Sequence, residues 1–178
     1  MYALTTLFNF DSLPVFADIW QKLKKNCGLV TIDEFSFVHL SWQGAQGYQL
    51  EPVRDVLGEI ACSTKAIPIK TAGIGVFSGH EPVLFLNVVK SRRLMELHEM
   101  LWDRIIPFSQ EYNAYYAPDE WVPHITLTHG PFLPADLACA ISELMFEPLS
   151  LELNIDNLAL IFMQDGSVGI DSRYSLAA

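Results

Sequence analysis

Two short segments of this chain each place a histidine two residues before a hydroxyl side chain. Residues 37–42 have the sequence FVHLSW, and residues 122–127 have the sequence VPHITL. Successive side chains of an extended strand point to opposite faces, so His39 shares a face with Ser41 and His124 shares a face with Thr126. The apolar residues between them point the other way, into packing. Two matching pairs predict one shared cleft.

The residue types in this cleft suit general acid–base chemistry. Imidazole has an unperturbed pKa of about 6.5, so near neutral pH one histidine accepts a proton while its partner donates one. The two hydroxyls donate hydrogen bonds to oxygen atoms on which negative charge develops. A single histidine on a strand is more often a packed structural residue. The matched pair therefore carries the catalytic interpretation.

Length, composition and charge are those of a folded protein with a small ligand. The 178 residues fit a single domain, or two small lobes built by duplication. Hydrophobic residues make up 51% of the chain and charged residues 18%, which excludes a disordered protein. The net charge of -10 has the wrong sign for binding a long polyanion through its phosphates. We therefore expect no extended nucleic-acid binding. A small nucleotide or an RNA end needs only a local positive potential and stays open as a ligand.

The cysteines and the apolar segments indicate the compartment. Cys27, Cys62 and Cys139 lie far apart and have no Cys-x-x-Cys spacing. We expect each to be a small apolar residue in or near the core, with no disulfide scaffold and no zinc site. The chain shows no signal-like N-terminus and no apolar run near membrane-spanning length. We therefore expect a cytoplasmic monomer without membrane contact.

The residue pattern predicts the same order of elements twice. Each half has a strand, a helix, a histidine strand, a second helix and a further strand. The first half comprises a strand over 2–10, a helix capped by Asp11 or Ser12 and ended by Gly28, the His39 strand, a helix over 52–60 and a strand over 66–77 in which Gly73 and Gly75 mark bulges or close approaches. The second half comprises 83–89, 94–105, 121–128, 137–145 and 149–155, and a final hairpin turns at Asp165-Gly166.

These features resemble the two-histidine phosphoesterases, the superfamily of the bacterial 2′-5′ RNA ligase-like proteins and cyclic nucleotide phosphodiesterases. The resemblance covers most of the chain. It rests on His39-Leu40-Ser41, His124-Ile125-Thr126, the GIGVF segment at 73–77, the WVPHITL segment at 121–127 and the final Asp-Gly hairpin. Ser41 stands where threonine is more frequent in the family, a change that keeps the hydrogen-bond donor.

The resemblance implies a bilobed, duplicated α+β fold. Two antiparallel-rich sheets would form a V-shaped cleft with helices on the outside. The single domain would span residues 1–178, with pseudo-symmetric lobes at approximately 1–80 and 81–178. It also implies a metal-independent reaction on a phosphodiester, with no cofactor.

The family's usual assignment gives each of the four side chains a role. His124 would be the base that activates water, and His39 the acid that protonates the departing ribose oxygen of a 2′,3′-cyclic phosphate. Ser41 and Thr126 would bind the nonbridging phosphate oxygens. A near-symmetric site can exchange the two histidine roles with the orientation of the substrate.

Further residues are candidate substrate contacts. His129 follows the second motif and would supply charge to the cleft, and Trp121 and Tyr115 offer aromatic faces on which a base can stack. Strand alternation directs Trp42 away from His39, into the core. A metal site is not expected, because His124 and His129 are an odd number of residues apart and point to opposite faces while the strand stays regular.

The leading interpretation is a hydrolase that opens 2′,3′-cyclic phosphates of small nucleotides or RNA ends, with 2′-5′ RNA ligase chemistry as a close variant. The alternatives are a noncatalytic module that binds a nucleotide or RNA end in the same cleft, and a purely structural interaction protein. Binding alone would not require two matched histidines, which favours the enzyme.

Overall fold

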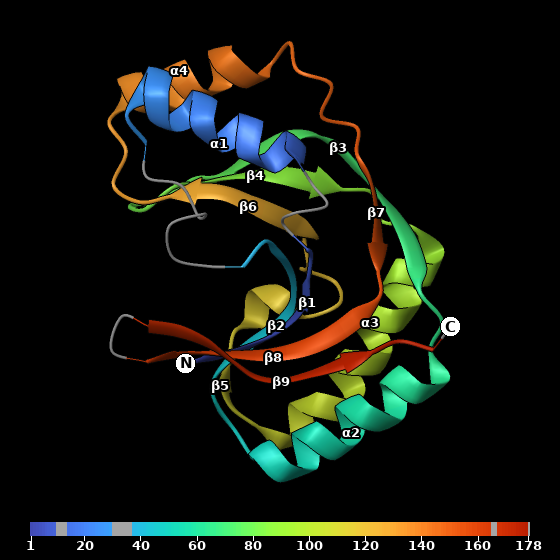
Figure 1. The fold of residues 1–178 in the computed structure, drawn as a ribbon. Helices are drawn as coiled ribbons and strands as arrows, with labels where there is room; N and C mark the ends of the chain where they lie inside the picture. Colours follow the sequence, from blue (N-terminus) through green and yellow to red (C-terminus); the bar gives the residue numbers. More distant parts are fainter. Residues whose placement is uncertain (10–13, 30–36, 165–166, 178) are drawn as a thin grey trace.

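A curled antiparallel sheet forms the framework of the molecule, with helices on its outer surface (Figure 1). The structure is a computed structural model that describes residues 1–9, 14–29, 37–164 and 167–177, and within these ranges nine strands are present. Eight of them follow the order β7-β3-β4-β6-β2-β1-β8-β9, and β5 pairs with β2 off this path. The α+β fold with antiparallel strands is therefore confirmed.

Apart from β5, the strands lie close to their predicted positions. The strands are β1 (Tyr2–Leu7), β2 (His39–Tyr48), β3 (Ile67–Phe77), β4 (Val83–Val88), β5 (Ser109–Tyr112), β6 (His124–His129), β7 (Glu152–Ile155), β8 (Asn157–Gln164) and β9 (Ser167–Ser175). The pattern did not predict β5, a four-residue strand with little apolar character. The turn at Asp165-Gly166 lies outside the described residues.

In the described residues, four α-helices follow from apolar residues at helical spacing. They are α1 (Pro14–Cys27), α2 (Leu50–Ser63), α3 (Arg92–Ile105) and α4 (Pro134–Leu144), with short 3-10 helices at Ile106–Phe108 and Ala114–Tyr116. Gly28 ends α1 with a φ of 67°, a conformation that favours glycine, as predicted. Ser91 caps α3 by accepting a hydrogen bond from the backbone N–H of Leu94. The caps predicted for α1, Asp11 and Ser12, lie outside the described residues.

The two halves of the sheet do not coincide with the two halves of the sequence. One half-sheet is β7-β3-β4-β6, on the side of the molecule that carries α1 and α4; the other is β2-β1-β8-β9, with α2 and α3 on its side (Figure 1). Each half-sheet therefore combines strands from both sides of residue 80. β3 leaves the first half of the chain to pair with β4, and β8 leaves the second half to pair with β1. The order of elements along the sequence does not predict this reciprocal exchange of strands.

The glycines expected in β3 have the predicted roles. Gly73 has a φ of 71° and lies where the β3–β4 register shifts between Thr71 and Ile74. A Cβ at Gly75 would stand 2.5 Å from the ring of Phe85. Gly75 therefore lets an aromatic ring on β4 lie directly across β3.

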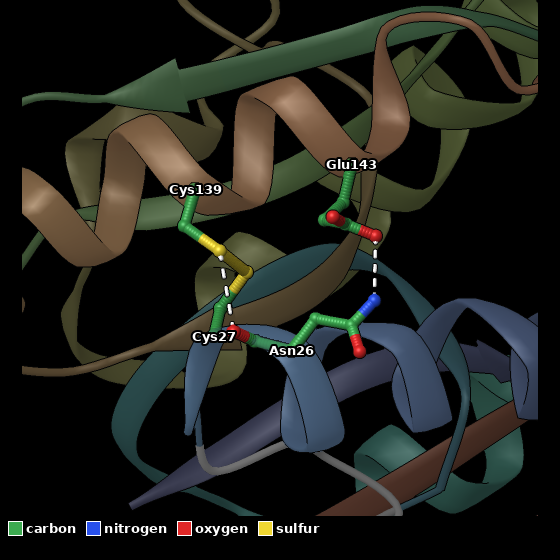
Figure 2. Close-up of a disulfide and its surroundings, with 4 residues drawn as sticks. All are labelled: Asn26, Cys27, Cys139 and Glu143. Carbon is green, nitrogen blue, oxygen red and sulfur yellow. Dashed lines mark hydrogen bonds between the residues drawn. A yellow bond between two sulfur atoms is a disulfide. The ribbon is translucent and has the colours of Figure 1, made fainter.

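Two cysteines form a disulfide, which corrects the expectation that all three are free. Cys27, at the end of α1, is bonded to Cys139 in α4, and the two lie 112 residues apart in the sequence (Figure 2). Next to the disulfide, the amide of Asn26 donates a hydrogen bond to the Glu143 carboxylate over 2.8 Å. The disulfide ties together two helices from opposite halves of the chain. Cys62 is a free, exposed thiol, so it is not a core residue either.

None of the described helices combines the length and the apolar character needed to cross a membrane.

Breaking the disulfide should lower stability without changing the fold. Closing a loop of this length restricts the unfolded chain, so Cys139→Ser should lower the free energy of unfolding by about 2–4 kcal/mol. Cys62→Ser, the matched control, should lower it by less than about 0.5 kcal/mol, because Cys62 is exposed. Urea unfolding with and without reductant measures both, and reductant should bring the wild type to the level of Cys139→Ser. Three alkylatable thiols in the unreduced wild type would contradict the assignment.

Candidate active site

The two histidine motifs meet where the half-sheets join. β2 pairs with β6 antiparallel, with Leu40 opposite Ile125, and both of these side chains are fully buried. Neighbours of this pair along each strand point to the opposite face. The flanking residues on that face are His39, Ser41, His124 and Thr126. A local two-fold relation thus places both histidines and both hydroxyls on the same side of the sheet.

This face is hollowed into a cleft. The first motif lines a depression of about 420 Å³, and the second lines a depression of about 860 Å³. The two depressions have lining residues in common, namely Asn113, Tyr116 and Met163. They are adjoining parts of one cleft that extends across the β2–β6 junction.

Matching hydrogen bonds orient the two imidazoles. Nδ1 of His39 lies 2.6 Å from the carbonyl oxygen of Phe37, and Nδ1 of His124 lies 2.7 Å from that of Val122. A carbonyl oxygen only accepts, so Nδ1 carries the proton in both rings. In the neutral rings Nε2 then holds a lone pair, and it is the atom left for chemistry.

Both histidines favour the neutral form in the free protein. Burial lowers the pKa of His39, and the hydrogen bond to Phe37 opposes this shift only in part. Burial also lowers the pKa of His124; the bond to Val122 raises it, and the charge of a protonated His39 lowers it further. The two rings are therefore electrostatically coupled. A bound phosphate anion would favour protonation of one of them.

A β-bulge follows each motif at the same place. The β1–β2 register skips Trp42, and the β4–β6 register skips Leu127, so in both strands the extra residue comes directly after the hydroxyl residue. Each bulge reverses the alternation beyond it. Gly44 and His129 then return to the cleft face and line the two depressions. The expectation that His129 points away from His124 fails for this reason.

Aromatic rings support His124 from one side. The ring centroids of Phe77 and Phe85 lie 4.9 Å and 5.0 Å from that of His124, and 4.2 Å from each other. Gly75 allows Phe85 to occupy this position. Such apolar contact is the physical source of the burial that lowers the pKa of His124.

Behind the two histidine strands lies a buried aromatic stack. His98 stacks on Trp121 with 3.8 Å between ring centroids, and Trp121 stacks on Trp42 at 5.4 Å. The indole N–H of Trp121 donates to the carbonyl oxygen of Ser41 over 3.1 Å. Trp121 borders the larger depression but is only 1% exposed, and its buried ring supports β2. Trp42 packs in the core, as predicted.

Two tyrosines differ sharply in their surroundings. Tyr115 lines the larger depression and is 79% exposed, which keeps it available as a substrate contact. Tyr116 lies between the two depressions and forms a hydrogen bond with Ser41, while burial raises its pKa. The sequence pattern did not place Tyr116 beside Ser41, because the 3-10 helix Ala114–Tyr116 is too short to give a periodic signal.

Among the residues that the structure describes, no group of three or more His, Cys, Asp or Glu side chains is arranged to hold a metal ion.

The chain matches known proteins in sequence pattern and in fold. A family model described as the 2′-5′ RNA ligase superfamily matches residues 5–166. The protein TT0787 of Thermus thermophilus has a similar structure, with a TM-score of 0.65, 15% identity, and coverage of 98% of this chain and 97% of that chain. No curated protein sequence matches the chain.

Two further solved structures share the fold. LigT of E. coli, complexed with 3′-AMP, gives a TM-score of 0.53 at 14% identity and covers 99% of this chain and 97% of its own. Usb1 of Kluyveromyces marxianus gives 0.53 at 10% identity, with coverage of 98% and 97%. At these identities, the structural matches show the fold alone.

Histidine titration should reveal the lowered pKa values. In a proton NMR titration of the free protein, His39 and His124 should each give a midpoint below about 6.5, because burial disfavours the charged ring. Burial lowers the pKa of His98 to about 4. The His98 ring should therefore stay neutral, and its signal should not shift, over the pH range in which His39 and His124 titrate. His39→Ala and His124→Ala assign the signals, and each should raise the midpoint of the remaining partner if the two charges repel. Midpoints above about 6.5 for both would contradict the described burial.

Proposed function

This chain belongs to the 2′-5′ RNA ligase superfamily, and from that premise we propose that it is a metal-independent phosphoesterase that hydrolyses 2′,3′-cyclic phosphates. One observation carries the proposal: β2 and β6 pair so that two equivalent imidazoles face one cleft, each with Nδ1 bound to a backbone carbonyl. Acid and base are both supplied by the chain. The reaction then needs no cofactor.

In the proposed reaction the two rings take complementary roles. Nε2 of His124 accepts a proton from water as the water oxygen bonds to phosphorus. Nε2 of protonated His39 gives its proton to the ribose oxygen as the bond from that oxygen to phosphorus breaks. The product is a ribose with one free hydroxyl and one phosphate monoester. Each proton transfer typically contributes about 10² to 10⁴ in rate.

The hydroxyls complete the site. Ser41 and Thr126 hold equivalent positions beside the two imidazoles and donate hydrogen bonds to the nonbridging oxygens as negative charge builds up. Tyr116 bonds to Ser41 and limits the rotation of its hydroxyl. The two-fold relation allows the acid and base roles to exchange when a substrate binds in the opposite orientation.

Cleft size favours a nucleotide. Depressions of about 860 and 420 Å³ accommodate a mononucleotide, given the typical volumes of small-ligand sites. The LigT structure of the same fold contains 3′-AMP, which carries a phosphate on a ribose oxygen. With a 5′-hydroxyl in place of water, the same groups would form a 2′-5′ linkage. A noncatalytic binding module would have no use for two tautomer-fixed histidines.

Substitutions of the four side chains should act unequally on the hydrolysis of a 2′,3′-cyclic nucleotide. His39→Ala and His124→Ala should each lower kcat by about 10² to 10⁴, the effect of a lost general acid or base. Ser41→Ala and Thr126→Ala should lower it by about 10 to 10³, because other donors or water substitute in part. His80→Ala, which removes a histidine outside the cleft, should leave kcat unchanged.

All variants are assayed with chelator present throughout, after thermal unfolding shows that each is folded. Folded His39→Ala and His124→Ala proteins that turn over at the wild-type rate would contradict the mechanism. A wild-type activity that chelator abolishes and one divalent ion restores would contradict metal independence.

A further inference from the structure

The cleft in which the phosphate is proposed to bind contains acidic side chains and neither lysine nor arginine. Glu111 lines the depression that holds His39, and Glu120 lines the one that holds His124. Both carboxylates are exposed at the cleft surface. His129 lines the larger depression, and neither depression is lined by a lysine or an arginine.

No lysine or arginine from any part of the chain lines this cleft. All 11 lysines and arginines of the protein fall within the described residues, and none of them lines either depression. The segments outside the description, 10–13, 30–36, 165–166 and 178, contain no lysine or arginine in their sequence. The amino group of Met1 also lines the smaller depression, where it donates a hydrogen bond to the carbonyl oxygen of Met163 at 3.3 Å. No lysine or arginine side chain is therefore placed to neutralise a second phosphate in this cleft.

Glu111 is held at the cleft by the backbone. It is the sole non-glycine residue with a positive φ, 49°, in the described parts of the chain. The β2–β5 pairs on either side of it, Ala45 with Tyr112 and Gly47 with Gln110, fix its position opposite Gln46, which lines the same depression. A strained conformation at a cleft surface is typical of residues with a functional placement.

Resting on the proposed function, we infer that the cleft selects substrates with a single phosphodiester charge, and that Glu111 and Glu120 determine this selectivity by repelling further phosphates. One imidazolium and the hydroxyl donors match the single charge of a cyclic phosphodiester. An additional phosphate meets carboxylates and neither a lysine nor an arginine, so like-charge repulsion weakens its binding. The substrate class is then a small cyclic phosphate that lacks other phosphates, and a polynucleotide end is disfavoured.

The test compares two substrates that differ by one phosphate. Adenosine 2′,3′-cyclic phosphate carries one negative charge, and its 5′-phosphorylated form adds between one and two charges at neutral pH. At low ionic strength, kcat/KM should be about tenfold higher for the cyclic phosphate without the 5′-phosphate. This is the size expected when repulsion from two exposed carboxylates, Glu111 and Glu120, is added together. Added salt should narrow this ratio, because it screens repulsion between exposed charges.

Matched variants separate local repulsion from net charge. Glu111→Gln and Glu120→Gln should each narrow the ratio by about two- to fivefold, the range for one exposed charge interaction. Glu99→Gln removes the same charge from the exposed face of α3 and should leave the ratio unchanged. Calorimetry with adenosine 3′-monophosphate and adenosine 3′,5′-bisphosphate should show the same preference in binding.

The outcomes distinguish the two proposals. Equal or better turnover and binding of the doubly phosphorylated compounds, or variants that behave like Glu99→Gln, would overturn the selectivity inference and leave the proposed function standing. Binding that discriminates by charge without any turnover would contradict the proposed function and support the selectivity. If neither nucleotide binds, the proposed function and the selectivity inference are both overturned.

Discussion

The backbone pairing of β2 with β6 is the constraint on which the site depends. Leu40 and Ile125 lie opposite each other and are fully buried, so their packing holds the two strands at one register. A shift of one residue would turn every side chain of a strand to the other face. Burial of two large aliphatic side chains, worth about 1.5–3 kcal/mol each, therefore also directs His39 and His124 into the cleft. The chemistry depends on an apolar contact one residue away from it.

The remainder of the fold stiffens this junction. Neither half of the sequence contains a complete half-sheet, because β3 and β8 each pair with a strand from the other half. The disulfide adds a covalent tie between α1 and α4. Behind the junction, the buried stack of His98, Trp121 and Trp42 supports β2 through a hydrogen bond to Ser41. The acidic residues of the cleft, Glu111 and Glu120, come from the segment after α3, where β5 pairs with β2.

Local rules predicted the parts of the site that depend on local geometry. Strand alternation paired His39 with Ser41 and His124 with Thr126, and helical spacing located α1 to α4. Nonlocal contacts could not be predicted in this way. The Cys27–Cys139 bond joins residues that no spacing rule relates, and the exchange of β3 and β8 depends on strand pairing alone. The bulge at Leu127 changed the face of His129, since one extra residue reverses the alternation.

The central claim is that the two histidines act on one phosphate. A crystal structure of the protein with a nucleoside 2′-phosphate tests it most directly. The account predicts one phosphate group with Nε2 of His39 and Nε2 of His124 on opposite sides of it, each within hydrogen-bond distance, and with the hydroxyls of Ser41 and Thr126 on its remaining oxygens. A phosphate bound by one histidine alone, or bound outside the β2–β6 junction, would contradict the account.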